Sequence, residues 1–146
     1  MAGSSDRNDP FAAFNFQVVI DGVTVAGFSE VSGLTTETDP IEYRTGAEIN
    51  HVRKLPGLAK YSNITLKRGY TTSPELWSWR QKVIQGKTER QSGSIVLLNE
   101  AREPALKWKF TEGWPRKWEG PSFNAKNNEI AIETLEIVCE TIELDV

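Results

Sequence analysis

Apolar and polar residues alternate along much of this chain, and this period of two constrains its fold more than any other feature. Successive side chains of a strand point to opposite faces, so a half-buried strand shows this alternation. It is clear at residues 14–20, 61–70 and 106–110, and a short apolar run at 94–99 is typical of a central strand. The pattern predicts a mainly β protein.

Turn signals divide the first half of the chain into strand pairs. Asp21-Gly22 is a two-residue hairpin signal, and residues 23–28 would form its return strand. Another arm is expected at 41–44. Residues 50–60 follow it and read as a projecting hairpin or loop, with a turn at its centre at 54–57.

The second half contains a connection and a long final strand. Residues 113–125 are rich in Pro, Gly and aromatic residues, and are expected to connect strands while Trp114 and Trp118 pack at the surface. The last strand, 129–144, changes the parity of its apolar positions after Ile132. A β-bulge would re-aim the side chains there.

One helix is expected among the strands, over residues 74–85. Ser73 is a good N-cap, Pro74 suits the first helical position, and Gly86 would end the helix. An apolar stripe at helical spacing is formed by Leu76, Trp79 and Val83, with Trp77 and Ile84 beside it. A single amphipathic helix should cover one open face or end of a sheet.

The composition argues against catalysis and metal binding. Cys139 is the single cysteine and His51 the single histidine among 146 residues, which excludes an internal disulfide and a cysteine-based zinc site. A surface position is expected for His51 and a packing role for Cys139. Since no nucleophile, base and orienting group come together in the pattern, we expect no catalytic residue, no cofactor and no enzymatic activity.

Charge is unevenly placed along the chain, although its net value is only −3. Residues 40–69 carry six bases and two acids, whereas residues 127–146 carry six acids and no base. Such blocks indicate complementary surfaces, which meet either within one chain or between copies. The net acidic balance argues against a dedicated nucleic-acid binder.

The chain is long enough for one domain, expected at 11–146 after a flexible tail at 1–10. No apolar run reaches the roughly 18 residues of a spanning helix. The small polar N-terminus lacks the apolar segment of a signal peptide. Synthesis in the cytoplasm without a leader is therefore expected.

Several motifs, in this order and spacing, resemble the tail tube proteins of contractile phages and of phage-tail-like contractile injection systems. The resemblance covers about residues 11–144. Its motifs are Phe28-Ser29-Glu30-Val31-Ser32-Gly33-Leu34, Glu42-Tyr43-Arg44-Thr45-Gly46, Lys54-Leu55-Pro56-Gly57, Asn63-Ile64-Thr65-Leu66-Lys67-Arg68-Gly69, Trp114-Pro115 and Gly120-Pro121.

The resemblance implies an antiparallel β-sandwich or partial barrel with one flanking α-helix and a projecting loop at 46–60. Six copies would form a ring, and rings would stack into a hollow tube inside a contractile sheath. On contraction the tube would be driven through a target envelope, and its lumen would conduct cargo. The implied partners are further copies of the chain, the sheath, baseplate or spike proteins, a tube-terminating protein and effector cargo, with nucleic acid only in a phage tail.

The resemblance also implies which residues make contacts between subunits and rings. These predicted assembly residues are Gly46, Lys54, Leu55, Pro56, Gly57, Lys67 and Arg68. Three alternatives remain open at this point. They are a tube initiator or baseplate adaptor of the same fold, a ring protein of type VI secretion, and a small β-barrel that binds a ligand through Trp114 and Trp118.

Overall fold

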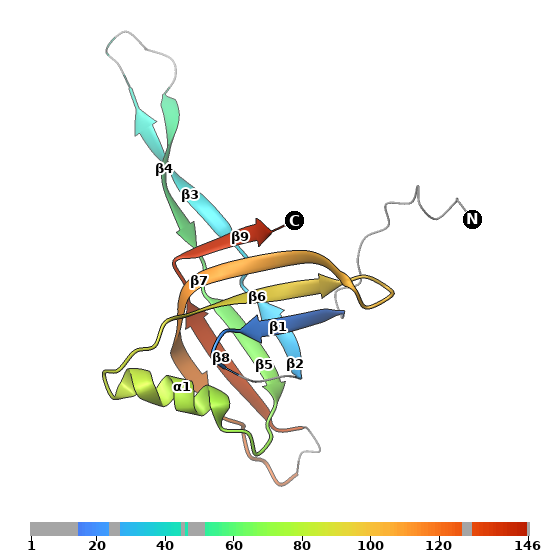
Figure 1. The fold of residues 1–146 in the computed structure, drawn as a ribbon. Helices are drawn as coiled ribbons and strands as arrows, with labels where there is room; N and C mark the ends of the chain where they lie inside the picture. Colours follow the sequence, from blue (N-terminus) through green and yellow to red (C-terminus); the bar gives the residue numbers. More distant parts are fainter. Residues whose placement is uncertain (1–14, 24–26, 45, 47–51, 127–129, 146) are drawn as a thin grey trace, which may run out of the picture.

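The computed structural model describes residues 15–23, 27–44, 46, 52–126 and 130–145. Nine strands and one helix lie within them (Figure 1). In chain order they are β1 (Phe16–Ile20), β2 (Phe28–Ser32), β3 (Thr36–Tyr43), β4 (Arg53–Tyr61), β5 (Ile64–Gly69), α1 (Glu75–Ile84), β6 (Gln91–Leu98), β7 (Pro104–Glu119), β8 (Ile132–Val138) and β9 (Thr141–Asp145). The expected mainly β fold with one helix is confirmed. The predicted tail at 1–10 and His51 lie outside the described residues.

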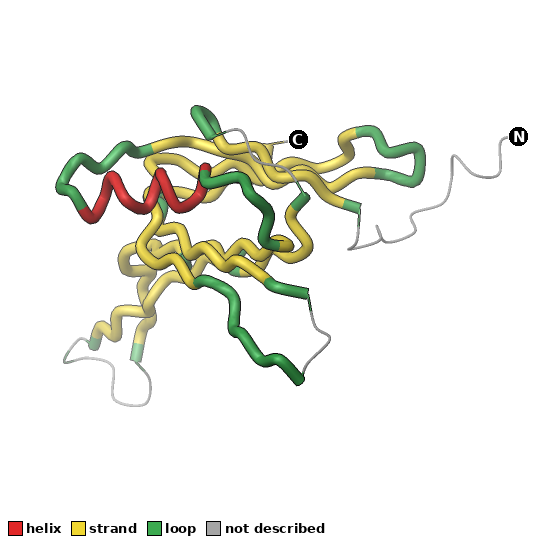
Figure 2. Tube along the Cα trace, turned by 90° about the horizontal axis from the view of Figure 1, so that it is seen from below, coloured by secondary structure: helices red, strands yellow, loops and turns green. Residues whose placement is uncertain are grey.

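Two antiparallel layers share one long strand, β7. One layer has the order β1-β6-β7-β9, and the other has the order β7-β8-β5-β2. Figure 2 shows the layers one above the other, with α1 at their side. The strand β7 turns from one layer into the other next to Glu112, whose φ of 52° is left-handed. Since no closed barrel forms, the fold is the expected sandwich or partial barrel.

The predicted connection at 113–125 is therefore wrong in its first half, because residues 113–119 continue β7. Pro115 signalled a loop, yet it lies in the strand beside a register shift between Pro115 and Lys117. A proline is tolerated at such an irregularity, where the ladder does not need its missing N–H.

The core lies between the two layers and beneath the helix. Its buried members are Val18, Ile20, Ile64, Leu66, Leu76, Trp79, Ile95, Phe110, Leu135, Ile137 and Cys139. Trp79 also donates from its indole N–H to the Glu89 carbonyl at 2.8 Å. The helix is confirmed within a residue at each end, but Pro74 rather than Ser73 occupies its N-cap position. The carbonyl of Ser73 instead accepts a hydrogen bond from Arg68.

Two strand pairings differ from the expected hairpins. Asp21-Gly22 does form a tight turn, closed by a bond of 3.1 Å from the Val23 N–H to the Ile20 carbonyl. However, β1 pairs with β6, and β2 pairs with β5. Both partner strands carry buried apolar residues, and pairing with them overrides the local turn signal.

The final strand contains a break instead of the predicted bulge. From Ile132 to Ile137, β8 pairs with β5 without a register shift, so the predicted bulge after Ile132 is wrong. The chain leaves β8 at Cys139 and re-enters the other layer as β9. Glu133 lies on the buried side of β8, together with Leu135 and Ile137. Because an acidic residue interrupts the apolar pattern on that side, the sequence resembles that of a strand with a bulge.

Candidate assembly surface

The strands β3 and β4 form a two-stranded arm that stands out from the sandwich (Figure 1). Among the described strands they pair only with each other. Every residue of β3 is exposed, and so is every residue of β4 except Gly57 and Tyr61. Both faces of the arm are therefore available for contact.

Four predicted assembly residues, Lys54, Leu55, Pro56 and Gly57, lie in the middle of β4. The expected turn at these residues is wrong: they form a strand, and the chain reverses between Tyr43 and Arg53. Pro-Gly is a turn signal in isolation. Here Pro56 lies on an exposed ribbon opposite Pro40, beside a register shift, where strand prolines are tolerated. Gly46 is exposed, within the connection between the two strands.

The two faces of the arm differ in character. Opposed residues of an antiparallel pair share a face. One face carries Ile41 opposite Leu55 and Tyr43 opposite Arg53, and the three apolar side chains are about half exposed. The other face pairs Glu42 with Lys54. Leu58, which is 85% exposed, lies at the register shift that interrupts the regular alternation of the two faces. Exposed apolar and charged side chains thus occur together on the arm.

A bulge in β4 favours glycine at position 57. Between the pairs Thr38–Ala59 and Pro40–Pro56, the two β4 residues Gly57 and Leu58 oppose the single residue Asp39. A Cβ at Gly57 would lie 2.7 Å from the Asp39 carbonyl oxygen. The carboxylate of Asp39 also accepts a hydrogen bond from Lys60, and this bond with the attraction of the two charges raises the pKa of Lys60.

The neighbouring predicted residues Lys67 and Arg68 point to opposite sides of β5. Lys67 is partly exposed, with its ammonium 3.2 Å from the Glu30 carboxylate. Arg68 is only 3% exposed, and its Nε lies 2.6 Å from Oε1 of Glu133. Arg68 therefore holds β5, β8 and the start of the helix together, and we leave it out of the assembly surface.

Glu133 was missed in the sequence because an acidic residue in an apolar strand reads as a solvent-facing position. It is 1% exposed, and its second oxygen accepts a bond of 2.6 Å from the Trp118 indole N–H. The available signal was parity, since Glu133 shares a strand face with Leu135 and Ile137. A buried carboxylate on that face needs a charged partner, and Arg68 supplies it.

The predicted aromatic packing involves Trp118 more than Trp114. The ring of Trp118 meets Trp77 edge to face at 4.9 Å between centroids and Tyr70 at 6.2 Å. This cluster ties β7 to the helix. Trp114 is half-buried, opposite Val138 of β8.

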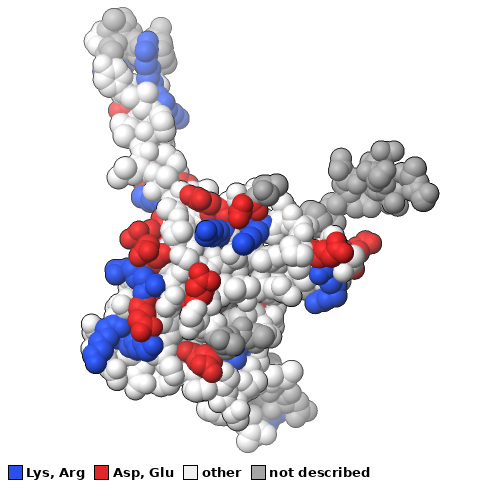
Figure 3. All heavy atoms as spheres, viewed as in Figure 1, with Lys and Arg blue, Asp and Glu red and all other residues white. Residues whose placement is uncertain are grey.

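Much of the uneven charge is matched inside the chain. Glu133 and Glu136 of the acidic C-terminal block pair with Arg68 and Arg116. Acidic and basic side chains alternate over the body in Figure 3, whereas basic side chains gather on the arm. The described bases near its end are Arg44, Arg53 and Lys54. Basic side chains are therefore concentrated where the chain projects.

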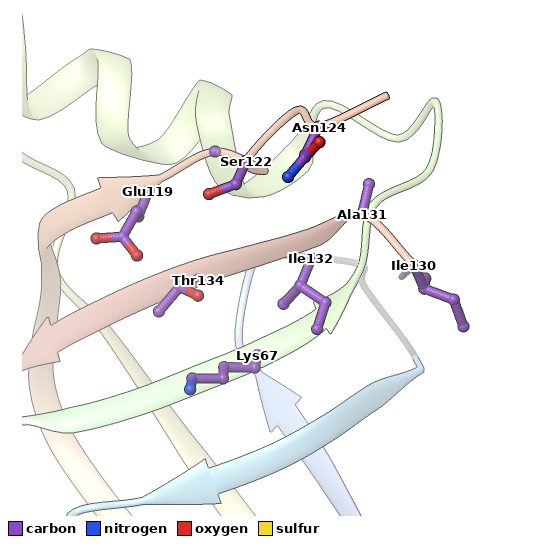
Figure 4. Close-up of a pocket in the computed structure, with 9 residues that line it drawn as sticks. Lys67, Glu119, Ser122, Asn124, Ile130, Ala131, Ile132 and Thr134 are labelled. Atoms are coloured by element: carbon purple, nitrogen blue, oxygen red, sulfur yellow. The ribbon is translucent and has the colours of Figure 1, made fainter. Parts of the chain in front are cut away.

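An open groove of about 370 Å³ lies at the end of the body opposite the arm, and we call it the β5–β8 groove (Figure 4). Its lining includes Lys67, Glu119, Asn124, Ile130, Ile132 and Thr134. Within the described residues, no group of three metal-ligating side chains comes together. In that same part of the chain no helix is long and apolar enough to cross a membrane.

The family model of the T4-like virus tail tube protein gp19 matches residues 12–143. The chain belongs to this family. The residues that match the tail tube family include those of the sandwich, the arm, the helix and the β5–β8 groove. The resemblance seen in the motifs is thereby confirmed.

Solved structures agree with the tail tube assignment. One similar chain comes from the PVC sheath-tube complex of an extracellular contractile injection system, at 29% identity and a TM-score of 0.84; the match covers 93% of this chain and 91% of that one. Another, from the PVC sheath/tube terminator, has 28% identity and a TM-score of 0.85, with coverages of 95% and 99%. Comparison with curated proteins gives no match.

A more distant structure shares the fold alone. Hcp1 from Flavobacterium johnsoniae has 20% identity and a TM-score of 0.57 over 90% of this chain and 94% of that one. The higher TM-scores of the injection-system chains favour a tail tube protein over a ring protein of type VI secretion.

Proposed function

We propose that this tail tube protein is the repeating subunit of the inner tube of a contractile tail or injection system. Six copies form a ring, rings stack into a hollow tube, and contraction of a sheath drives the tube through a target envelope. The observation that carries the proposal is the arm, which exposes both of its faces together with apolar side chains on them.

An isolated two-stranded ribbon is at best marginally stable in water. The exposed Ile41, Leu55 and Leu58 of the arm add a cost that burial against a partner would remove. Six-fold repetition supplies that partner in every copy, without a second kind of protein. Free edges of β2 and β9 offer further places for neighbouring chains to pair.

The partners follow from the assemblies in which similar chains occur. The solved structures are titled as a sheath-tube complex, a sheath/tube terminator and a tube-terminating cap. For this chain we propose a sheath, a baseplate or spike, and a terminating protein as partners, with effector cargo in the lumen and nucleic acid only in a phage tail. Its role is structural, and it joins the particle after synthesis in the bacterial cytoplasm.

We propose that Gly46, Lys54, Leu55, Pro56 and Gly57 of the arm region, together with Lys67, contribute to contacts between copies. All but Gly57 are exposed or, for Lys67, partly exposed on the isolated chain. Gly57 contributes indirectly, because it permits the bulge that shapes the arm.

Negative-stain electron microscopy of the purified chain and of native particles tests the function. Stacked six-fold rings of constant diameter are expected. A tube initiator or adaptor of the same fold would be present at one ring per particle, so the copy number in native particles separates it from the tube subunit. Particles whose tubes lack this chain would contradict the proposal.

A further inference from the structure

The arm continues a strand pair of the sandwich. In the β2–β5 pair Ser32 lies opposite Thr65, and in the arm Thr36 lies opposite Tyr61. Residues 33–35 separate these pairs on one side of the ribbon and residues 62–64 on the other, so the register is the same before and after the gap. The two strand pairs are therefore one ribbon, interrupted where the arm leaves the sandwich in Figure 1. We call residues 33–35 and 62–63 the elbow.

The backbone of the elbow has a conformation that favours glycine. Gly33 has a φ of 98°, in the left-handed region that residues with a side chain rarely adopt. A Cβ at this position would lie 2.0 Å from the carbonyl oxygen of Asn63. The two segments of the elbow are therefore in close backbone contact at the point where regular pairing stops.

Hydrogen bonds close the elbow in place of the interrupted ladder. The N–H of Thr35 donates to the Gly33 carbonyl at 2.8 Å, and the N–H of Ser62 donates to the Thr35 carbonyl at 3.1 Å. The Ser62 hydroxyl lies 2.8 Å from the carbonyl oxygen of Gly33 and 3.2 Å from that of Thr35. Ser62 therefore holds residues 33–35 against the start of β5.

A carboxylate of the sandwich holds the elbow from outside the ribbon. The side-chain amide of Asn63 donates to Oε2 of Glu136 on β8 at 2.9 Å. The same oxygen pairs with Arg116 of β7. The Glu136 side chain is only 22% exposed, so solvent screens these bonds less than those of a fully exposed pair. Through Glu136 the elbow is connected to two further strands of its layer.

We propose that Glu136 is a positioning residue which, through Asn63, fixes the angle between the arm and the sandwich in the single chain. Gly33 and Ser62 set the path of the backbone through the elbow, and Glu136 ties this path to β7 and β8. An arm that is already held at one angle loses less conformational freedom when it binds a partner. That consequence rests on the proposed tube function, whereas the angle itself is a property of the unassembled chain.

The distance between two spin labels in the unassembled chain tests this inference. The labels are attached at Glu42→Cys on the arm and Lys107→Cys on β7, both exposed positions, in a Cys139→Ala background. We expect one narrow distribution of distances. Glu136→Ala removes the acceptor and should widen the distribution at least about twofold, because fewer bonds then hold the elbow. Glu136→Gln keeps an oxygen that accepts from Asn63 and should leave the distribution narrow.

A second variant and a control make the test specific. Asn63→Ala removes the donor and should widen the distribution as Glu136→Ala does, although it leaves the pair of Glu136 with Arg116 in place. Glu119→Ala removes a carboxylate that pairs with Lys117 instead, and it should leave the distribution unchanged. Circular dichroism of every variant verifies that the chain folds.

A wide distribution in the unsubstituted labelled chain, or a narrow one in both alanine variants at positions 63 and 136, would overturn the positioning role. Either result would leave the tube function standing, because the labels are measured in protein that remains in the supernatant after tubes are sedimented. Native particles with tubes built from another protein would overturn the tube function and leave the positioning role standing.

Discussion

Arg68 and Glu133 face each other across β5 and β8 as a buried ion pair, with Nε of the arginine 2.6 Å from Oε1 of the glutamate. Further bonds hold both partners: an Arg68 amino group donates to the Ser73 carbonyl, and the Trp118 indole donates to Glu133. One pair thus fixes two strands, the helix start and the aromatic cluster. Its position explains why an exposed role for Arg68 does not fit this fold.

Removal of one partner should be costly. Glu133→Ala leaves the Arg68 guanidinium buried without its counter-charge, and we expect a loss of about 3–5 kcal/mol in the free energy of unfolding. Replacement of both, as Arg68→Met/Glu133→Leu, should be much milder because no charge is stranded. Urea denaturation, monitored by tryptophan fluorescence, measures the free energy of unfolding of the single and the double variant. Equal destabilisation by the single and double variants would contradict the expectation.

Alanine at position 57 should distort the arm and leave the sandwich intact. Its Cβ would meet the Asp39 carbonyl oxygen at 2.7 Å, so Gly57→Ala should destabilise the local ribbon by about 1–3 kcal/mol. We expect faster hydrogen exchange in β3 and β4 and a lower yield of tubes. Gly46→Ala is the matched control for hydrogen exchange in the ribbon, because a Cβ there meets nothing within 4 Å.

Truncation of Leu58 should separate assembly from folding. Its side chain is 85% exposed, so Leu58→Ser should change the free energy of unfolding of the isolated chain by less than about 0.5 kcal/mol. Tube formation should nevertheless fall, since the leucine is expected to be buried between rings. Val19→Ser, at a half-exposed site on β1, serves as the comparison. Unchanged tube length in Leu58→Ser would be evidence against Leu58 as a contact between copies.

Cys139 should make stability fall at alkaline pH. Burial raises the pKa of its thiol, so the folded chain holds this proton at a pH where the unfolded chain has begun to lose it. The stabilisation is complete below the ordinary thiol pKa and is lost as the pH rises through the folded value. Thermal melts of the wild type should decline more steeply above about pH 8.5 than those of Cys139→Ala. Parallel curves would refute the assignment.

The amphipathic strands and the helix could be predicted from the sequence because each follows a local period, as Ile64 and Leu66 or Leu76 and Trp79 do. The errors arose where a local signal lost to a distant partner. Pro115 predicts a loop, but it lies in a strand beside a register shift that the sequence does not reveal. Lys54-Leu55-Pro56-Gly57 predicts a turn, but in the structure Pro56 pairs with Pro40 of the neighbouring strand. Glu133 is typical of a solvent-exposed position, and only the structure shows that Arg68 pairs with it in the interior.

The family motifs identified the assembly region, but its two faces depended on pairing. No local pattern reveals that Glu42 opposes Lys54, because that register depends on the β4 bulge opposite Asp39. The β5–β8 groove combines Lys67 of β5 with residues of β7 and β8 that come much later in the chain, such as Glu119 and Thr134. Its existence follows only from the topology of the sheet.

The shared strand β7 has a mechanical consequence. Sixteen residues of one continuous backbone belong first to one layer and then to the other. In an ordinary sandwich the layers meet only through side chains, and shear can slide one over the other. Here a thrust applied to either layer passes along covalent bonds into its neighbour. Each subunit would therefore respond to compression as a single stiff plate, a useful property in a wall that is pushed end-on against an envelope.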